Sequence, residues 1–160
     1  MKEIFKTWNK FLTEVRAGSA QEVVSLISSG EKVLINVDKP MGTSKTFGGK
    51  KKNKVQLPFD YGEWKEIINP SDNMGWDFII VPSRSTGEGG EREETLVPLG
   101  HVKYKSDEET WKKVGKEMPE GIEGNTKIIV SPDGIVTEED KQAINNFFEN
   151  LVQFNKVEWY

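Results

Sequence analysis

The chain has 160 residues, of which 30% are charged and 35% hydrophobic, and its formal net charge is −4. This balance is typical of a polar globular protein rather than a disordered one, and the length fits one domain with a substantial core. The absence of cysteine excludes disulfides, thiolate metal sites and cysteine nucleophiles. No apolar run approaches the roughly 20 residues of a membrane span, and charges interrupt the N-terminus where a signal peptide has its apolar core. We therefore expect a cytoplasmic protein with no membrane partner.

Residues 1–30 are expected to form an N-terminal helical hairpin. Apolar residues recur at spacings of three and four between residues 2 and 16, the pattern of an amphipathic helix, and Gly18 ends it. Ser19 and Glu22 then have the spacing of a capping box that opens a second helix. The apolar face of the first helix must pack on the domain or on a partner, so self-association into a homo-oligomer is one expectation.

Residues 33–160 are expected to form the main body of a single domain that spans 1–160. Capping-box patterns at Ser106 and Thr137 open two further helices. Short β-rich runs predict strands, and stretches rich in Gly, Lys or Glu predict loops. The strands are expected at 33–37, 54–57, 64–68, 78–81, 95–104, 126–131 and 157–160, a loop or flexible hairpin at 45–54, and a loop at 83–94. This order predicts an α+β fold, a small closed or partly open antiparallel β-barrel with flanking N- and C-terminal helices.

Charge is unevenly spread along the sequence. Six lysines and one acid lie between Asp38 and Lys54, and four glutamates and one arginine lie between Glu88 and Glu94. A basic and an acidic segment on one small domain suit a site for phosphate and metal, although solvated loops have the same composition. The negative net charge argues against nucleic acid as a partner.

Two carboxylates, Asp72 and Asp77, lie where a turn leads into the predicted strand 78–81. Carboxylates held by rigid backbone suit hard divalent cations, which prefer oxygen ligands. The alternative is that Asp72 caps the turn and Asp77 is a solvated residue at the strand entrance.

From residue 33 to the end, the order of motifs resembles that of the soluble family I inorganic pyrophosphatases. The matching segments are Val-Asp-Lys-Pro-Met-Gly-Thr with Lys45 (37–45), Pro-Phe-Asp-Tyr-Gly (58–62), Asp-Asn-Met-Gly-Trp-Asp (72–77), Pro-Leu-Gly-His (98–101), Asn-Thr-Lys-Ile-Ile-Val-Ser-Pro (125–132), Phe-Phe-Glu (147–149) and Val-Glu-Trp (157–159). The resemblance implies an OB-like barrel in which a nest of carboxylates holds Mg²⁺, or Mn²⁺ in its place. In that family a metal-bridged water attacks the phosphate, which lysine, arginine and tyrosine hold.

The resemblance also implies roles for individual residues. Asp77, Tyr61 and Lys127 are the expected catalytic residues. Lys45, Tyr61 and Lys127 are expected to bind the substrate phosphate. The expected metal ligands are Asp72, Asp77, Asp38 (where the family has glutamate) and Glu120.

Several positions depart from the family pattern. The central aspartate of the signature is Met74, whose thioether is a poor ligand for magnesium, and a second acid is Asn125. The Tyr-Lys pair that follows Phe-Phe-Glu in the family is Leu151-Val152 here. Two functions stay open: metal-dependent hydrolysis of pyrophosphate or a related phosphoanhydride, and binding of a phosphorylated ligand or protein partner without turnover. A nucleic-acid binder that uses the lysines at 50–54 has less support, because the rest of the chain is acidic.

Overall fold

The computed structural model describes residues 15–46, 54–122 and 125–160. Its elements in chain order are β1 (Val15–Arg16), α2 (Ala20–Ile27), β2 (Val33–Lys39), β3 (Ser44–Thr46), β4 (Lys54–Gln56), β5 (Asp60–Asn69), β6 (Met74–Ile80), the 3-10 turn η2 (Pro82–Arg84), β7 (Gly90–Glu94), β8 (Val97–Lys103), α3 (Glu108–Lys113), β9 (Thr126–Ser131), α4 (Glu138–Glu149) and β10 (Glu158–Trp159). In these parts of the chain, no helix has the length and apolar character needed to cross a membrane.

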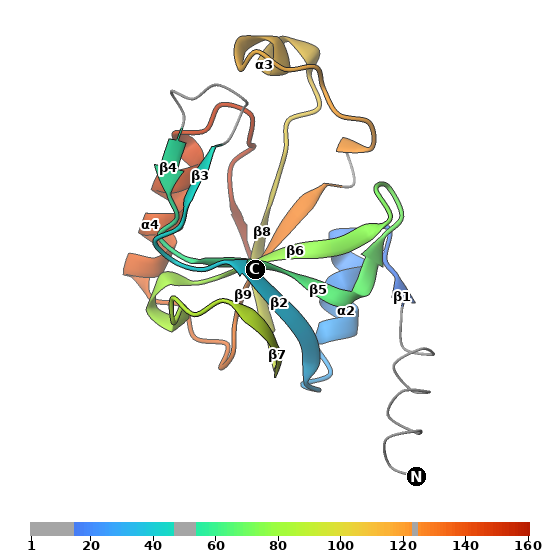
Figure 1. Ribbon diagram of the computed structural model, residues 1–160, viewed down its shortest axis with the longest axis vertical. Coiled ribbons are helices and arrows are strands. Elements are labelled where there is room, and N and C mark those ends of the chain that lie inside the picture. Colours follow the sequence, from blue (N-terminus) through green and yellow to red (C-terminus); the bar gives the residue numbers. More distant parts are fainter. Residues whose placement is uncertain (1–14, 47–53, 123–124) are drawn as a thin grey trace.

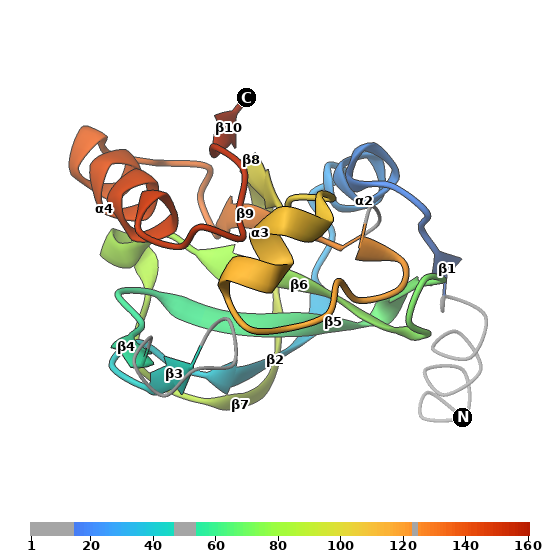
Figure 2. The ribbon, with the colours of Figure 1, turned by 90° about the horizontal axis from the view of Figure 1, so that it is seen from above.

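One curved sheet forms the centre of the molecule, with strand order β10-β8-β9-β6-β5-β2-β7 and β1 beside β5. It stays open between β7 and β10, and β3 and β4 form a separate hairpin. Helices α4 and α2 lie on opposite sides of it (Figures 1 and 2). The predicted α+β class with a partly open barrel and flanking helices is therefore confirmed.

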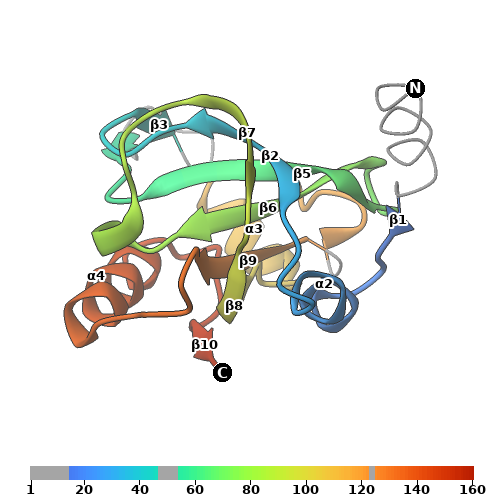
Figure 3. The ribbon, with the colours of Figure 1, turned by 90° about the horizontal axis from the view of Figure 1, so that it is seen from below.

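The prediction of an antiparallel barrel is wrong for two strand pairs, because β6 pairs with β9 and β1 pairs with β5 in parallel. Strand β9 enters the sheet between β6 and β8, and it runs antiparallel to β8. On its other side it runs parallel to β6. Figure 3 shows β5 and β6 crossing the molecule between α4 and α2.

The sheet buries an apolar cluster on each face. Successive side chains of a strand point to opposite faces, so Phe78 and Ile80 of β6 join one cluster while Ile79 joins the other. The first cluster is covered by Val23 and Ile27 of α2, and the second by Ile144 and Phe148 of α4. The face on the α4 side also carries the polar groups described below.

At the N-terminal end, the helix predicted for residues 2–16 falls on residues 1–14, which lie outside the described part of the chain. Val15 and Arg16 form strand β1 on β5, so the prediction is wrong for these two residues. The second helix is confirmed as α2: the Ser19 side chain accepts a hydrogen bond from the Glu22 backbone N–H, and Glu22 accepts one from the Gly18 N–H.

Three predicted boundaries need correction. Residues 83–94 include strand β7, which pairs along β2, as well as loop. Four of its five residues are charged and it lies at an edge of the sheet, so it lacks the apolar alternation that marks a half-buried strand. The strand predicted at 64–68 begins at Asp60, and Asp107, not Ser106, caps α3 by accepting a hydrogen bond from the Thr110 N–H.

Candidate functional site

Tyr61, Asp77 and Lys127 meet on the face of the sheet that α4 covers. They come from the neighbouring strands β5, β6 and β9. Asp77 lies two residues before Ile79 and Lys127 two residues before Ile129, so both side chains share the face of these two buried residues. The three residues predicted to be catalytic are thus brought together by strand pairing.

Hydrogen bonds join the three side chains directly. The Tyr61 hydroxyl donates to Asp77 Oδ2 at 2.9 Å, and Lys127 Nζ donates to the same oxygen at 3.1 Å. Lys127 Nζ also makes a short hydrogen bond to the Tyr61 hydroxyl oxygen. Lys127 is 2% exposed, and a buried ammonium needs such partners to offset its lost hydration.

Two more lysine amines approach the Tyr61 ring. Lys45 Nζ, from β3, lies 5.2 Å from the ring centroid, and Lys39 Nζ, from the end of β2, lies 5.8 Å from it. Lys127 Nζ is 4.9 Å from the same centroid and 5.2 Å from that of Tyr104. Three cations therefore converge on one phenol ring, within the range of cation–π attraction.

The site is buried at its base and open on one side. Tyr61 is 5% exposed, whereas the side chains of Lys39 and Asp77 are 33% and 31% exposed. The cluster is therefore buried at Tyr61 and Lys127 and partly exposed at Lys39 and Asp77.

The charges at the site perturb one another. Burial, together with the nearby Lys39 and Lys127 ammonium groups, lowers the pKa of Lys45 to about 8, and Asp77 and Asp38 only partly oppose this. Burial raises the pKa of Tyr61, so its hydroxyl keeps the proton at neutral pH. Burial disfavours the charged form of Lys127, but the Tyr61 and Tyr104 oxygens and Asp77 outweigh it and raise the pKa of Lys127.

Hydrogen-bond donors already bind two of the three other expected metal ligands, Asp38 and Asp72. Asp38 Oδ2 accepts a hydrogen bond from Lys39 Nζ at 2.9 Å. Asp72 Oδ1 accepts one from the Met74 N–H at 3.0 Å, in the turn between β5 and β6. Glu120 is exposed in the turn before Ile122.

The donor set does not fit a nest for several magnesium ions. Within residues 15–46, 54–122 and 125–160, no three or more Asp, Glu, His or Cys side chains form a group that could hold a metal ion. Mg²⁺ binding therefore stays a prediction.

Asp60, a residue that the sequence did not single out, holds the loops around the site. Its side chain is fully buried, and its carboxylate accepts hydrogen bonds from the backbone N–H groups of Met41 at 2.8 Å, Thr86 at 2.8 Å and Gly87 at 3.1 Å. The Met41 bond fixes the connection from β2 to β3, which carries Lys45. The sequence signal for Asp60 is an acid inside the segment Pro-Phe-Asp-Tyr-Gly (58–62), whose composition is typical of a turn.

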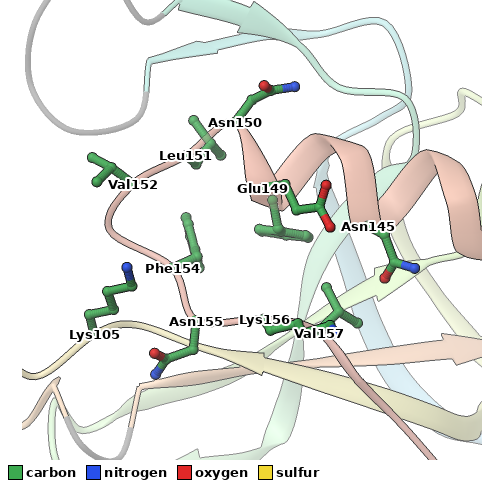
Figure 4. Close-up of a pocket in the computed structure, with 11 residues that line it drawn as sticks. Lys105, Asn145, Glu149, Asn150, Leu151, Val152, Phe154, Asn155, Lys156 and Val157 are labelled. Carbon is green, nitrogen blue, oxygen red and sulfur yellow. The ribbon is translucent and has the colours of Figure 1, made fainter.

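A groove of about 490 Å³ follows the end of α4, where the family resembled has its Tyr-Lys pair. In Figure 4 its wall includes Lys105 and Val152, and Phe154 lies between them and the helix. The Phe154 ring stacks on Tyr104 with the centroids 4.4 Å apart, and Tyr104 in turn lies beside Lys127. The stacked rings of Phe154 and Tyr104 therefore connect the groove with Lys127.

Comparison with solved structures gives a distant likeness. No family model matches the chain, and no curated protein matches it. Among solved structures it is similar to the crystal structure of inorganic pyrophosphatase from Ehrlichia chaffeensis, with 14% sequence identity and a TM-score of 0.44 over 81% of this chain and 86% of that one. These values do not place the chain in that family, so the argument for function depends on the residues of the site.

Proposed function

We propose that this protein binds a small phosphorylated anion at the site formed by Lys39, Lys45, Tyr61 and Lys127. The observation that supports this most is the convergence of the three lysine amines on the Tyr61 ring, at 4.9 to 5.8 Å from its centroid. Phosphate oxygens are strong acceptors, and charge-assisted hydrogen bonds from ammonium groups are among the strongest that proteins make.

Each group has a distinct part in this proposal. Lys127 is a fixed positive charge at the base of the site, oriented by Asp77. The neutral Tyr61 hydroxyl donates its one proton to Asp77 Oδ2 and accepts a hydrogen bond from Lys127, so it helps to hold that ammonium in place. Lys39 lies opposite Tyr61 in the β2–β5 pair and Lys45 lies in the β3–β4 hairpin, and both contact the anion from the solvent side. The like charges of the lysines repel one another, and a bound anion relieves that repulsion.

Metal-dependent hydrolysis of pyrophosphate or a related phosphoanhydride is the second candidate. Asp77 favours it, because a carboxylate beside Tyr61 and Lys127 has the composition that the family resemblance implies for a reacting phosphate. Hydrolysis ranks below binding because the described carboxylates do not form the multi-ligand cluster that several cations need.

Isothermal titration calorimetry with inorganic phosphate and pyrophosphate tests the first candidate. We expect saturable binding by the wild-type protein and a loss of at least about tenfold in Lys45→Gln, since one charge-assisted contact contributes roughly 1.5 to 3 kcal/mol. Lys32→Gln is the matched control, because this exposed lysine precedes the opposite end of β2. An affinity equal in wild type and Lys45→Gln would show that the anion binds elsewhere.

Release of phosphate from pyrophosphate in the presence of Mg²⁺ or Mn²⁺ tests the second candidate. Turnover that disappears in Asp77→Ala would support hydrolysis. The absence of any release at high protein concentration, in a sample that binds pyrophosphate, would leave binding as the function.

A further inference from the structure

We infer that this site takes its phosphorylated anion directly, with no divalent cation between the carboxylates and the phosphate. The inference rests on the proposed function and specifies the form of its ligand: the free anion and not its magnesium complex. It follows from the groups that already bind Asp77 Oδ2 and from the positive charges around it.

One oxygen of the Asp77 carboxylate is already paired with groups of the protein. Asp77 Oδ2 accepts hydrogen bonds from the Tyr61 hydroxyl and from Lys127 Nζ. A cation that took this oxygen would have to displace an ammonium that is 2% exposed. Removing one partner of a buried ion pair is strongly unfavourable, because the other charge stays buried and unpaired.

The surrounding charges also disfavour a cation. Lys39, Lys45 and Lys127 are all close enough to the Tyr61 ring for cation–π contact, and their mutual repulsion contributes to the lowered pKa of Lys45. A divalent cation at Asp77 would add two positive charges to this cluster. A multiply charged anion does the opposite, and its attraction to the cluster weakens when magnesium neutralises part of its charge.

In the turn that resembles the metal-binding signature, a positively charged arginine side chain of the protein is already bound. The Arg16 guanidinium donates hydrogen bonds through two nitrogens to Asn73 Oδ1. Arg16 belongs to β1, which pairs with β5, so the sheet fixes its position. The neighbouring Met74 is 60% exposed and offers only a thioether, a soft group that hard cations avoid.

Calorimetric titration of the full chain with pyrophosphate, once in EDTA and once with saturating Mg²⁺, tests the inference. We expect binding in EDTA and an affinity about tenfold weaker with Mg²⁺, because the magnesium complex carries less negative charge. Binding that requires Mg²⁺ would overturn the inference and leave the proposed function intact. The absence of binding in both titrations would overturn the proposed function itself.

A second measurement follows the metal alone. Titration of Mn²⁺ into the protein, observed by electron paramagnetic resonance, is expected to give the same free-ion signal for the wild type and for Asp77→Asn. A bound Mn²⁺ signal in the wild type that disappears in Asp77→Asn would overturn the inference whether or not the protein hydrolyses anything.

Discussion

At Lys45, burial and two neighbouring lysines act in the same direction, and they bring the pKa of its ammonium to about 8. The group is therefore charged at neutral pH and loses its proton as the pH rises through that value. A residue of this kind makes the affinity of the site sensitive to pH in a range where an ordinary lysine is insensitive.

The first prediction concerns sulfate, whose own charge is constant between pH 7 and 10. We expect its affinity for the wild-type protein to fall as the pH rises through about 8, as Lys45 becomes neutral. Lys45→Arg should keep its affinity at higher pH, because guanidinium does not deprotonate there. Calorimetry at several pH values checks this, with Lys32→Arg as control. The same pH profile in wild type and Lys45→Arg would contradict the assignment.

Asp60, at the start of β5, stabilises the fold through its buried carboxylate, which accepts backbone hydrogen bonds. Asp60→Ala leaves three backbone N–H groups, those of Met41, Thr86 and Gly87, without their acceptor. We expect a loss of about 3 kcal/mol in the free energy of unfolding, since buried unsatisfied donors cost about 1 to 3 kcal/mol each and some regain water. Urea denaturation measures it. Asp72→Ala, at an exposed turn, should cost less than about 1 kcal/mol, and equal losses would refute the argument.

Among the elements, α4 is joined to the sheet by one carboxylate at its first turn. Asp140 accepts hydrogen bonds from the Thr137 N–H at 3.0 Å, the Ser83 N–H at 2.8 Å and the Ser83 hydroxyl at 2.6 Å. The first completes a capping box, and the other two tie the helix to the turn that follows β6. Burial alone would raise the pKa of Asp140, but the bonds from Ser83 and Thr137 outweigh it and lower the pKa.

Because the folded-state pKa of Asp140 is lowered, the contribution of this residue to stability decreases at acid pH. Above the ordinary value of 3.8, Asp140 is ionised in both the folded and the unfolded chain, and its stabilising contribution is complete. Below 3.8 the unfolded chain binds the proton first, so stability falls as the pH drops toward the lower folded pKa. Urea unfolding between pH 7 and 3 should show a smaller decline for Asp140→Asn than for the wild type. Parallel declines would mean that other carboxylates account for acid sensitivity.

Elements were predictable where local and tertiary signals agree. Strand β9 occupies the predicted residues 126–131, and α4 begins after the predicted cap Thr137. Strand β7 escaped detection because an edge strand in water needs no apolar alternation.

The residues of the site also divide into those that sequence motifs identify and those whose role depends on tertiary contacts. Tyr61, Asp77 and Lys127 were identified from motif order, and strand register brings them together. Lys39 looked like an ordinary solvated charge in a lysine-rich segment. Asp60 was missed because its burial depends on N–H groups that lie 19 to 27 residues away in the sequence. Contacts of that range are set by how β2, β5 and the segment after β6 meet, which local patterns do not encode.

At the scale of the whole molecule, the site joins strands that are far apart in the chain. Its residues come from β2, β3, β5, β6 and β9, and β3 belongs to a hairpin outside the main sheet. Unfolding of the sheet separates all of them, so the site exists only in the folded state. Ligand binding and global stability are therefore coupled.

The last prediction follows from that coupling. Pyrophosphate at about 100 times its Kd should raise the free energy of unfolding by about 2.7 kcal/mol, since it binds the native state alone. Thermal unfolding followed by circular dichroism measures this as a rise in Tm that grows with ligand concentration. Lys32→Gln should show the same rise as the wild type, whereas Lys45→Gln, with an affinity at least about tenfold weaker, should gain at most about 1.4 kcal/mol at the same concentration. A rise of equal size in all three proteins would indicate a nonspecific effect of the anion, and it would remove the lysine cluster as the site of binding.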